Sequence, residues 1–154
     1  MLTEEENTEI TAELKRCDFK ESASVETLRI VQRHRGWISD ESIHDVAGVL
    51  CMSPAELDTV ATFYNFIYRR PVGRHIVQVC DSMVCWTMGY NPLHGMLSRK
   101  LGIGPGGTTS DNRFTLLPVA CLGACDRAPA MLVDDDLYGP VTPAMVDEIL
   151  GKYE

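Results

Sequence analysis

The sequence predicts an α/β protein with a small all-helical extension at its N-terminus, and three observations lead to this fold class. Up to about residue 70, apolar residues recur every three or four positions, which is the helical pattern. From residue 74 onward, short β-branched runs alternate with helical patterns. Between the two regions, Arg69-Arg70-Pro71-Val72-Gly73 combines a polar pair with a proline and a glycine, which is typical of a linker. We therefore expect a helical bundle over residues 1–70 and an α/β domain over residues 71–154.

Three short amphipathic helices are expected in the first region. The first starts near Ser24 and stops at Gly36, in the position where a glycine commonly ends a helix. The second starts at Ser39 or Asp40. The third opens at Ser53-Pro54-Ala55-Glu56, a capping box with proline at the first helical position. Its apolar stripe consists of Leu57, Val60, Ala61, Tyr64, Ile67 and Tyr68. Because no such helix can bury its stripe alone, the three should pack as a bundle.

Residues 1–20 carry an acidic and weakly periodic pattern, with Ile10 and Leu14 among its few apolar members. The ends of this pattern are poorly marked, so we expect a marginal helix or a mobile arm there. The bundle offers no catalytic constellation, since His34 and His44 lie alone on the polar sides of their helices.

The second region has the element order β-α-β-β-β-α. Its strands are expected at residues 74–80, 114–119, 130–133 and around 137–138. The helix between the first two strands has Asn91 as its N-cap, Pro92 at its first position, and Gly102 at its end. The last helix opens at Thr142-Pro143. A βαβ unit followed by a β-hairpin and a helix is the order of a thioredoxin-like fold.

Composition excludes several classes of function. The formal net charge of −8 and the pI near 4.9 argue against nucleic-acid binding, which needs a basic surface. The sequence has no run of about 18 apolar residues that could insert into a membrane. The N-terminus, Met-Leu-Thr-Glu-Glu-Glu, lacks the positive charge of a secretory signal. We therefore expect a cytoplasmic protein, in which clustered cysteines serve metal binding or catalysis more often than disulfides.

Four of the six cysteines form two short clips, each at the end of an expected strand. Cys80 and Cys85 follow the first strand, and Cys121 and Cys125 follow the second, with thirty-five residues between the clips. Strands joined by a helical crossover are parallel and right-handed, so their carboxyl ends lie at one edge of the sheet. We therefore expect the four thiols to meet around a single centre.

Thiolate sulfur is the soft ligand that selects zinc, copper(I) or iron–sulfur clusters. Four cysteines suit either a tetrahedral zinc ion or a [2Fe–2S] cluster with two thiolates on each iron. Neither clip has the C-x2-C spacing of a zinc knuckle, which favours the iron–sulfur cluster and leaves a zinc-stapled interaction module as an alternative. The small residues Gly123 and Ala124 would leave backbone N–H groups free to approach the cluster. Trp86 and Met88 could shield a cluster or serve ordinary packing.

The cysteine pattern resembles the thioredoxin-like [2Fe–2S] ferredoxin family, because Cys121-Leu122-Gly123-Ala124-Cys125 is also followed by Ala128-Pro129. Within that family, the chain is most similar to the NuoE-type subunits of NADH-quinone oxidoreductase, respiratory complex I. The resemblance extends from about residue 22 to the end. It includes the motifs Arg35-Gly36-Trp37-Ile38, Val60-Ala61-Thr62-Phe63-Tyr64, Pro71-Val72-Gly73-Arg74-His75, Cys80-Asp81-Ser82 and Arg113-Phe114-Thr115-Leu116-Leu117-Pro118.

By this resemblance, Cys80, Cys85, Cys121 and Cys125 bind one [2Fe–2S] cluster, with the first clip on one iron and the second clip on the other. The resemblance implies an electron-transfer subunit that docks beside the flavin- and NADH-binding subunit and other peripheral-arm subunits. FMN and NADH are then expected on that partner, and the chain is enzymatic only within its complex, peripheral to the cytoplasmic face of the inner membrane. An NAD-linked hydrogenase or formate dehydrogenase is the alternative parent complex.

Other features are expected to be structural. Cys17, an exposed thiol, and Cys51, a small buried side chain, lie outside both clips and are not expected to be ligands. The glycine-rich run 102–107 follows a helix and precedes a strand, which is the reverse of a phosphate-binding loop. A thiol–disulfide oxidoreductase would need a C-x-x-C pair, which the chain lacks. Pro129 stands where thioredoxin-like folds often hold a cis-proline.

Overall fold

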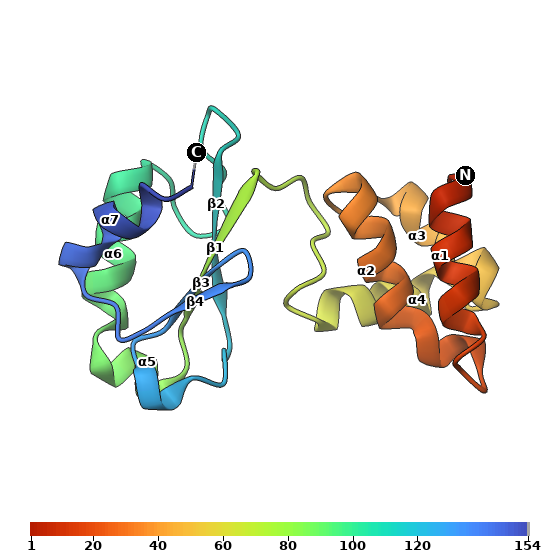
Figure 1. Cartoon of the computed structure of the whole chain (residues 1–154), viewed down its shortest axis with the longest axis horizontal. Coiled ribbons are helices and arrows are strands. Elements are labelled where there is room, and N and C mark those ends of the chain that lie inside the picture. The colour runs from red at the N-terminus through yellow and green to blue at the C-terminus, as the bar shows by residue number, and fades with distance from the viewer. Residues whose placement is uncertain (154) are drawn as a thin grey trace. The chain divides into compact units, whose positions relative to one another are not determined.

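The computed structural model (Figure 1) describes residues 1–153. The chain divides into two compact units, Met1–Pro71 and Val72–Glu154. The division lies one residue after the expected boundary between residues 70 and 71. Among the described residues no single helix is long and apolar enough to cross a membrane. Two consecutive helices, Asp40–Leu50 and Pro54–Phe63, together have the length and composition of a span, but the chain bends by 113° between them.

The first unit is built from four α-helices (Figure 1). They are α1 (Glu4–Leu14), α2 (Ser24–Arg35), α3 (Asp40–Leu50) and α4 (Pro54–Phe63), with a short 3-10 turn, Lys20–Ala23, before α2. The local signals act as predicted at three ends. Ser39 caps α3, the Ser53/Glu56 capping box opens α4, and Gly36 ends α2 in the left-handed conformation, with φ of 82°. Helix α2 begins at Ser24, as expected, but its N-cap residue is Ala23 and no side chain caps it, because the 3-10 turn leads directly into the helix.

Of the two alternatives expected at the N-terminus, a marginal helix or a mobile arm, the structure has the helix, α1, and its start is well capped. Thr3 and Glu6 form a capping box, in which each side chain bonds the backbone N–H of the other residue. Ile10 is 1% exposed and belongs to the core of the bundle. The Glu6 side chain is fully buried and bonds Arg35 of α2 with both oxygens, at 2.7 and 2.8 Å. The bundle therefore contains α1 in addition to the three helices expected to pack together.

Helix α4 also ends earlier than expected, at Phe63. The end lies there because Gln32 of α2 bonds the backbone of the following segment. Its side-chain amide donates to the Phe66 carbonyl at 2.8 Å and accepts from the Tyr68 N–H at 2.6 Å. Ile67 is still buried in the bundle, but from a turn and not from the helix.

The second unit contains a four-stranded sheet in the order β2-β1-β3-β4. The strands are β1 (His75–Cys80), β2 (Phe114–Val119), β3 (Met131–Val133) and β4 (Asp136–Tyr138). Strands β1 and β2 are parallel, as predicted, whereas β3 is antiparallel to both β1 and β4. Helices α6 (Tyr90–Leu101) and α7 (Val146–Leu150) lie on one side of this sheet (Figure 1). A 3-10 turn, Pro143–Met145, precedes α7.

Two features of this unit differ from the prediction. Helix α6 starts at Tyr90 after Gly89, whose φ is 128°, so Asn91 lies within the helix and does not cap it. A further helix, α5 (Met83–Met88), precedes it. Cys85 is the buried residue of α5, and the other side chains of this helix face solvent, so the segment carries no helical hydrophobic stripe.

Two separate clusters of buried side chains support the sheet. The larger one joins the strands to α6 and α7 through residues such as Val77, Leu97, Leu116 and Ile149. The smaller one lies where β1 and β2 end, and it contains both cysteines of the first clip.

Candidate metal centre

Strands β1 and β2 bring the two cysteine clips to the same edge of the sheet. Cys80 is the last residue of β1 and pairs in register with Val119, the last residue of β2. One residue further on, the Asp81 N–H donates to the Val119 carbonyl at 3.0 Å. Because Cys121 follows Val119 by two residues, both clips leave the sheet side by side, as the parallel arrangement predicts.

The first clip is buried. Cys80 is 3% exposed and Cys85 is 1% exposed. They pack with the small residues Ala124, Ala128 and Ala130, together with Val119. Small side chains bring the surrounding backbone close to the sulfur atoms, so its N–H groups can reach them.

The surroundings of the Cys85 thiol change its pKa in both directions. Burial raises the pKa of this thiol above its usual range. A hydrogen bond from the Ala130 backbone N–H acts in the opposite direction. The pKa is raised further by the side-chain hydrogen bond with Cys80 and by the charges of Cys80 and Cys125.

The second clip is exposed and is shaped by a tight turn. Gly123 has φ of 72°, in the left-handed region where a glycine is favoured. Its N–H donates to the Cys121 sulfur at 3.3 Å. Cys125 then begins a short 3-10 turn, Cys125–Arg127. The backbone N–H predicted to approach a sulfur atom at this glycine is therefore present.

Pro129 and helix α5 also lie at this edge of the sheet, beside the clips. The Ala128–Pro129 peptide bond is cis, as expected, and the Pro129 carbonyl accepts from the Val141 N–H at 2.9 Å. On α5, Trp86 and Met88 are 52% and 60% exposed, so neither is ordinary core packing. The Trp86 ring stacks on Tyr90, with ring centroids 5.0 Å apart.

The donor set fits a centre with two metal atoms better than a single ion. Among residues 1–153, no group of three or more histidine, cysteine, aspartate or glutamate side chains is placed to hold a metal ion, so the fit is judged from the chemistry of the donors alone. A structural zinc site needs four ligands around one atom, at about 2.3 Å for each sulfur. A [2Fe–2S] cluster takes its thiolates in pairs, on two iron atoms. This chain has two cysteine pairs on adjacent loops, each with a backbone N–H directed at a sulfur. That arrangement matches the pairwise ligation of a [2Fe–2S] cluster.

The family model of the thioredoxin-like [2Fe-2S] ferredoxins matches residues 9–154. The chain belongs to this family. Membership confirms the resemblance seen in the cysteine spacing, the thioredoxin-like fold class, and the [2Fe–2S] cluster as the cofactor that goes with it. The four-stranded mixed sheet with helices on one side agrees with that fold class.

Relatives and solved structures extend the comparison over the whole chain. A subunit of the NADH-quinone oxidoreductase of Pseudomonas aeruginosa is 48% identical over 153 residues, which are 99% of this chain and 92% of the relative. The subunit of the same name from Escherichia coli is 44% identical over the same shares. Among solved structures, a NAD+-reducing [NiFe]-hydrogenase matches with a TM-score of 0.70 and 25% identity. That match covers 84% of this chain and 22% of the hydrogenase chain.

The two remaining cysteines of this family member lie in the helical unit. Cys17 is half-buried and packs against the helical core. Cys51 is exposed, with the Lys20 ammonium 3.7 Å from its sulfur. The expectations of an exposed Cys17 and a buried Cys51 are therefore wrong. Cys51 lies outside because it ends α3 in the left-handed conformation, with φ of 59°, one residue beyond the buried stripe.

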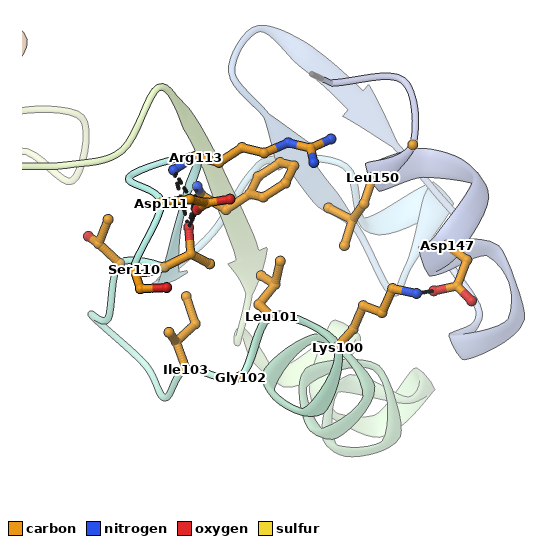
Figure 2. A pocket seen from close by; sticks show the side chains of 13 residues that line it. Lys100, Leu101, Gly102, Ile103, Ser110, Asp111, Arg113, Asp147 and Leu150 are labelled. Atoms are coloured by element: carbon orange, nitrogen blue, oxygen red, sulfur yellow. Dashed lines mark hydrogen bonds and ion pairs between the residues drawn. The ribbon is translucent and has the colours of Figure 1, made fainter.

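A pocket lies at the other end of the sheet (Figure 2). Its volume is about 840 Å³, and its walls include Phe114, the first residue of β2. Lys100 is paired with Asp147 at 2.9 Å, and Arg113 donates to the Tyr153 carbonyl. The pocket contains no cysteine of either clip, and part of the glycine-rich run forms its wall where α6 ends. A phosphate-binding loop would need the start of a helix there.

Proposed function

We propose that this chain is an electron-transfer subunit of an NADH-quinone oxidoreductase. Cys80 and Cys85 would bind one iron of its [2Fe–2S] cluster, and Cys121 and Cys125 would bind the other. The observation that carries the proposal is the meeting of the two clips at one edge of the sheet, where Cys80 pairs in register with Val119, two residues before Cys121. The family, whose characteristic cofactor is this cluster, supports the ligand set.

A [2Fe–2S] cluster accepts and returns one electron at a time. The protein residues set how it does so. The four thiolates hold the irons, and the N–H groups of Gly123 and Ala130 stabilise negative charge on the sulfur atoms. Ala124, Ala128 and Val119 exclude water from one side of the site, while the side of the second clip remains open to solvent.

The partner is proposed to carry the flavin and the NADH site. Relatives at 44% and 48% identity are subunits of NADH-quinone oxidoreductase, and the matching hydrogenase is NAD+-reducing. This chain would dock on that flavin-bearing subunit and exchange single electrons with its FMN, peripheral to the cytoplasmic face of the membrane. An NAD-linked hydrogenase is the second candidate as parent complex, because the hydrogenase match has a TM-score of 0.70.

The two units would be separate domains with different tasks. The cysteine clips all lie in residues 72–153, whereas the helical unit presents three exposed aromatic side chains at the end of α4: Phe63, Tyr64 and Phe66. Exposed aromatic side chains are enriched in protein interfaces. We propose that the helical domain contributes contacts to other subunits and takes no part in the redox step.

Co-expression with the flavin-bearing subunit tests this function. NADH should bleach the visible band of the cluster in the purified pair, and it should leave the isolated chain unchanged, because the flavin mediates between a two-electron donor and a one-electron acceptor. A matched pair with Cys121→Ser in this chain should still oxidise NADH at the flavin without bleaching that band. Reduction of the isolated chain by NADH at the same rate would contradict the proposal, and so would failure of the two chains to associate.

A further inference from the structure

We propose that Trp86 is a positioning residue for the first clip: its ring, stacked on Tyr90, attaches helix α5, and with it Cys85, to helix α6. This inference deepens the proposed function and rests on it, because it takes Cys85 as a ligand. It goes further by assigning a role to a side chain outside the ligand set. The role belongs to the chain itself and is present before a cluster is bound.

Helix α5 lacks the local features that commonly stabilise a helix. It spans six residues, Met83–Met88, and a helix this short is not stable by itself. Ser82 precedes it without a side-chain capping bond, its first turn carries no acid, and its last turn carries no base. The Trp86 N–H donates to the Ser82 carbonyl at 2.8 Å, which closes a turn but does not attach the helix to the rest of the unit.

Apolar packing also gives α5 little support. Met83, Val84, Trp86 and Met88 are 82%, 43%, 52% and 60% exposed. Gly89, which separates α5 from α6, has φ of 128°, so α6 does not continue the direction of α5. The orientation of α5 therefore depends on few contacts, and each of them has a large effect.

The Trp86 ring supplies a contact between α5 and the core of the unit. It stacks on Tyr90 of α6, with ring centroids 5.0 Å apart and ring planes 18° apart. Tyr90 is 8% exposed and belongs to the larger buried cluster. It stacks in turn on His94, with centroids 5.3 Å apart and planes 25° apart. Stacked rings at such distances stabilise a structure beyond the area that they bury. The three rings thus form one stack that begins on α5 and continues along α6.

The stack fixes the rotation of α5 about its own axis. Trp86 directly follows Cys85, and successive residues of an α-helix are turned by about 100°. A rotation that moved the Cys85 side chain would therefore also pull the Trp86 ring away from Tyr90. Cys85 shares a buried cluster with Ala124, which lies between the two cysteines of the second clip. The stack keeps the Cys85 side chain on the side of α5 where the second clip lies.

Hydrogen exchange of the cluster-free full chain, followed by mass spectrometry, tests the inference. In Trp86→Ala the amides of residues 83–88 should exchange roughly 3–10-fold faster than in the wild type, as the loss of one stacked ring pair implies. Met88→Ala is the matched control, since it removes a similarly exposed apolar side chain from the same helix and should leave the exchange unchanged. Trp86→Phe keeps an aromatic ring and should restore most of the protection.

The EPR spectrum of the reduced, cluster-loaded chain gives a second readout, which loss of a surface contact unrelated to Cys85 would not change. We expect Trp86→Ala to shift the g values and broaden the lines, because the Cys85 sulfur no longer has one orientation. Met88→Ala and Trp86→Phe should keep the wild-type spectrum.

Equal exchange at residues 83–88 in the wild type and Trp86→Ala would overturn the inference. A wild-type EPR spectrum of Trp86→Ala would overturn it too, and so would failure of Trp86→Phe to restore protection. A wild-type chain that binds no iron and sulfide would instead refute the proposed function, so the two failures are distinguishable.

Discussion

Replacing Glu6 with glutamine should loosen α1 from the helical unit. The Glu6 carboxylate is fully buried, accepts two hydrogen bonds from Arg35, and accepts a third from the Thr3 N–H at 2.8 Å. Glutamine has nearly the same shape, but it lacks the charge and offers one acceptor oxygen instead of two. The change therefore tests the ion pair and leaves the packing of α1 nearly intact.

The magnitude follows from the pKa of Glu6. The hydrogen bond with Arg35 is the largest cause that lowers this pKa, from 4.5 to about 2, and burial opposes it. A lowering from 4.5 to about 2 corresponds to about 3 kcal/mol, since one pKa unit is 1.36 kcal/mol. Removing one partner of a buried pair costs about 3–5 kcal/mol, which agrees. In the variant, we expect the free energy that keeps α1 packed on the unit to fall by about 3 kcal/mol. The equilibrium constant for opening of α1 then rises by more than ~100-fold.

The dependence on pH has a definite sign. The folded state lowers the pKa of Glu6, so the pair stabilises α1 fully above pH 4.5 and loses this contribution as the pH falls through about 2. The wild-type chain and the Glu6→Gln variant should therefore differ most at neutral pH. Their difference should shrink steadily between pH 4.5 and pH 2.

Hydrogen exchange of the amides of α1, followed by mass spectrometry, measures this opening directly. The matched control is Glu5→Gln, which removes a charge from the neighbouring exposed position of the same helical turn. In the control, the free energy of opening obtained from the exchange rates should change by less than ~0.5 kcal/mol. Equal protection of wild type and Glu6→Gln at pH 7 would refute this reasoning, and so would a difference that does not depend on pH.

Three further predictions concern the α/β unit and the cluster. Serine in place of any one of the four clip cysteines should abolish or strongly alter the EPR signal of the reduced protein, whereas Cys51→Ser should preserve it. An unchanged signal in a clip variant would contradict the ligand set. Leu97→Ala, at a fully buried position of α6, should lower the free energy of unfolding of this unit by about 2–5 kcal/mol in a urea titration, and a loss below ~1 kcal/mol would contradict the packing. Gly139→Ala should speed loss of the visible band to a chelator, because the new Cβ would collide with the backbone of Arg127 beside the second clip, while Gly104→Ala, with open space, should not.

Local signals explain why much of the fold could be predicted. The Ser53-Pro54-Ala55-Glu56 box specifies the start of α4 within four residues, and Gly36 specifies the end of α2. The β-branched runs before Cys80 and Cys121 predict two strands, and the crossover rule then makes them parallel. The position of both clips at one edge follows from these short-range patterns.

The features that the sequence did not fully predict have physical causes that lie outside a local window. Helix α1 depends on the Glu6–Arg35 pair, whose members are far apart in the sequence, although Thr3 and Glu6 do form a recognisable capping box. Helix α4 ends where Gln32, from another helix, bonds the following backbone. Helix α5 lacks a hydrophobic stripe because only Cys85 is buried. The left-handed conformation that exposes Cys51 occurs at a non-glycine residue, which sequence patterns rarely indicate.

Metal and sulfide analysis of the purified full chain, combined with Mössbauer spectroscopy, tests the central claim most directly. The claim is that the two clips at one edge of the sheet together hold a two-iron cluster. The predicted result is two iron and two acid-labile sulfide per chain, with two distinct iron environments after one-electron reduction, and loss of both elements when the four clip cysteines are replaced. One zinc per chain without sulfide would contradict it, and so would a full complement of iron and sulfide after that replacement.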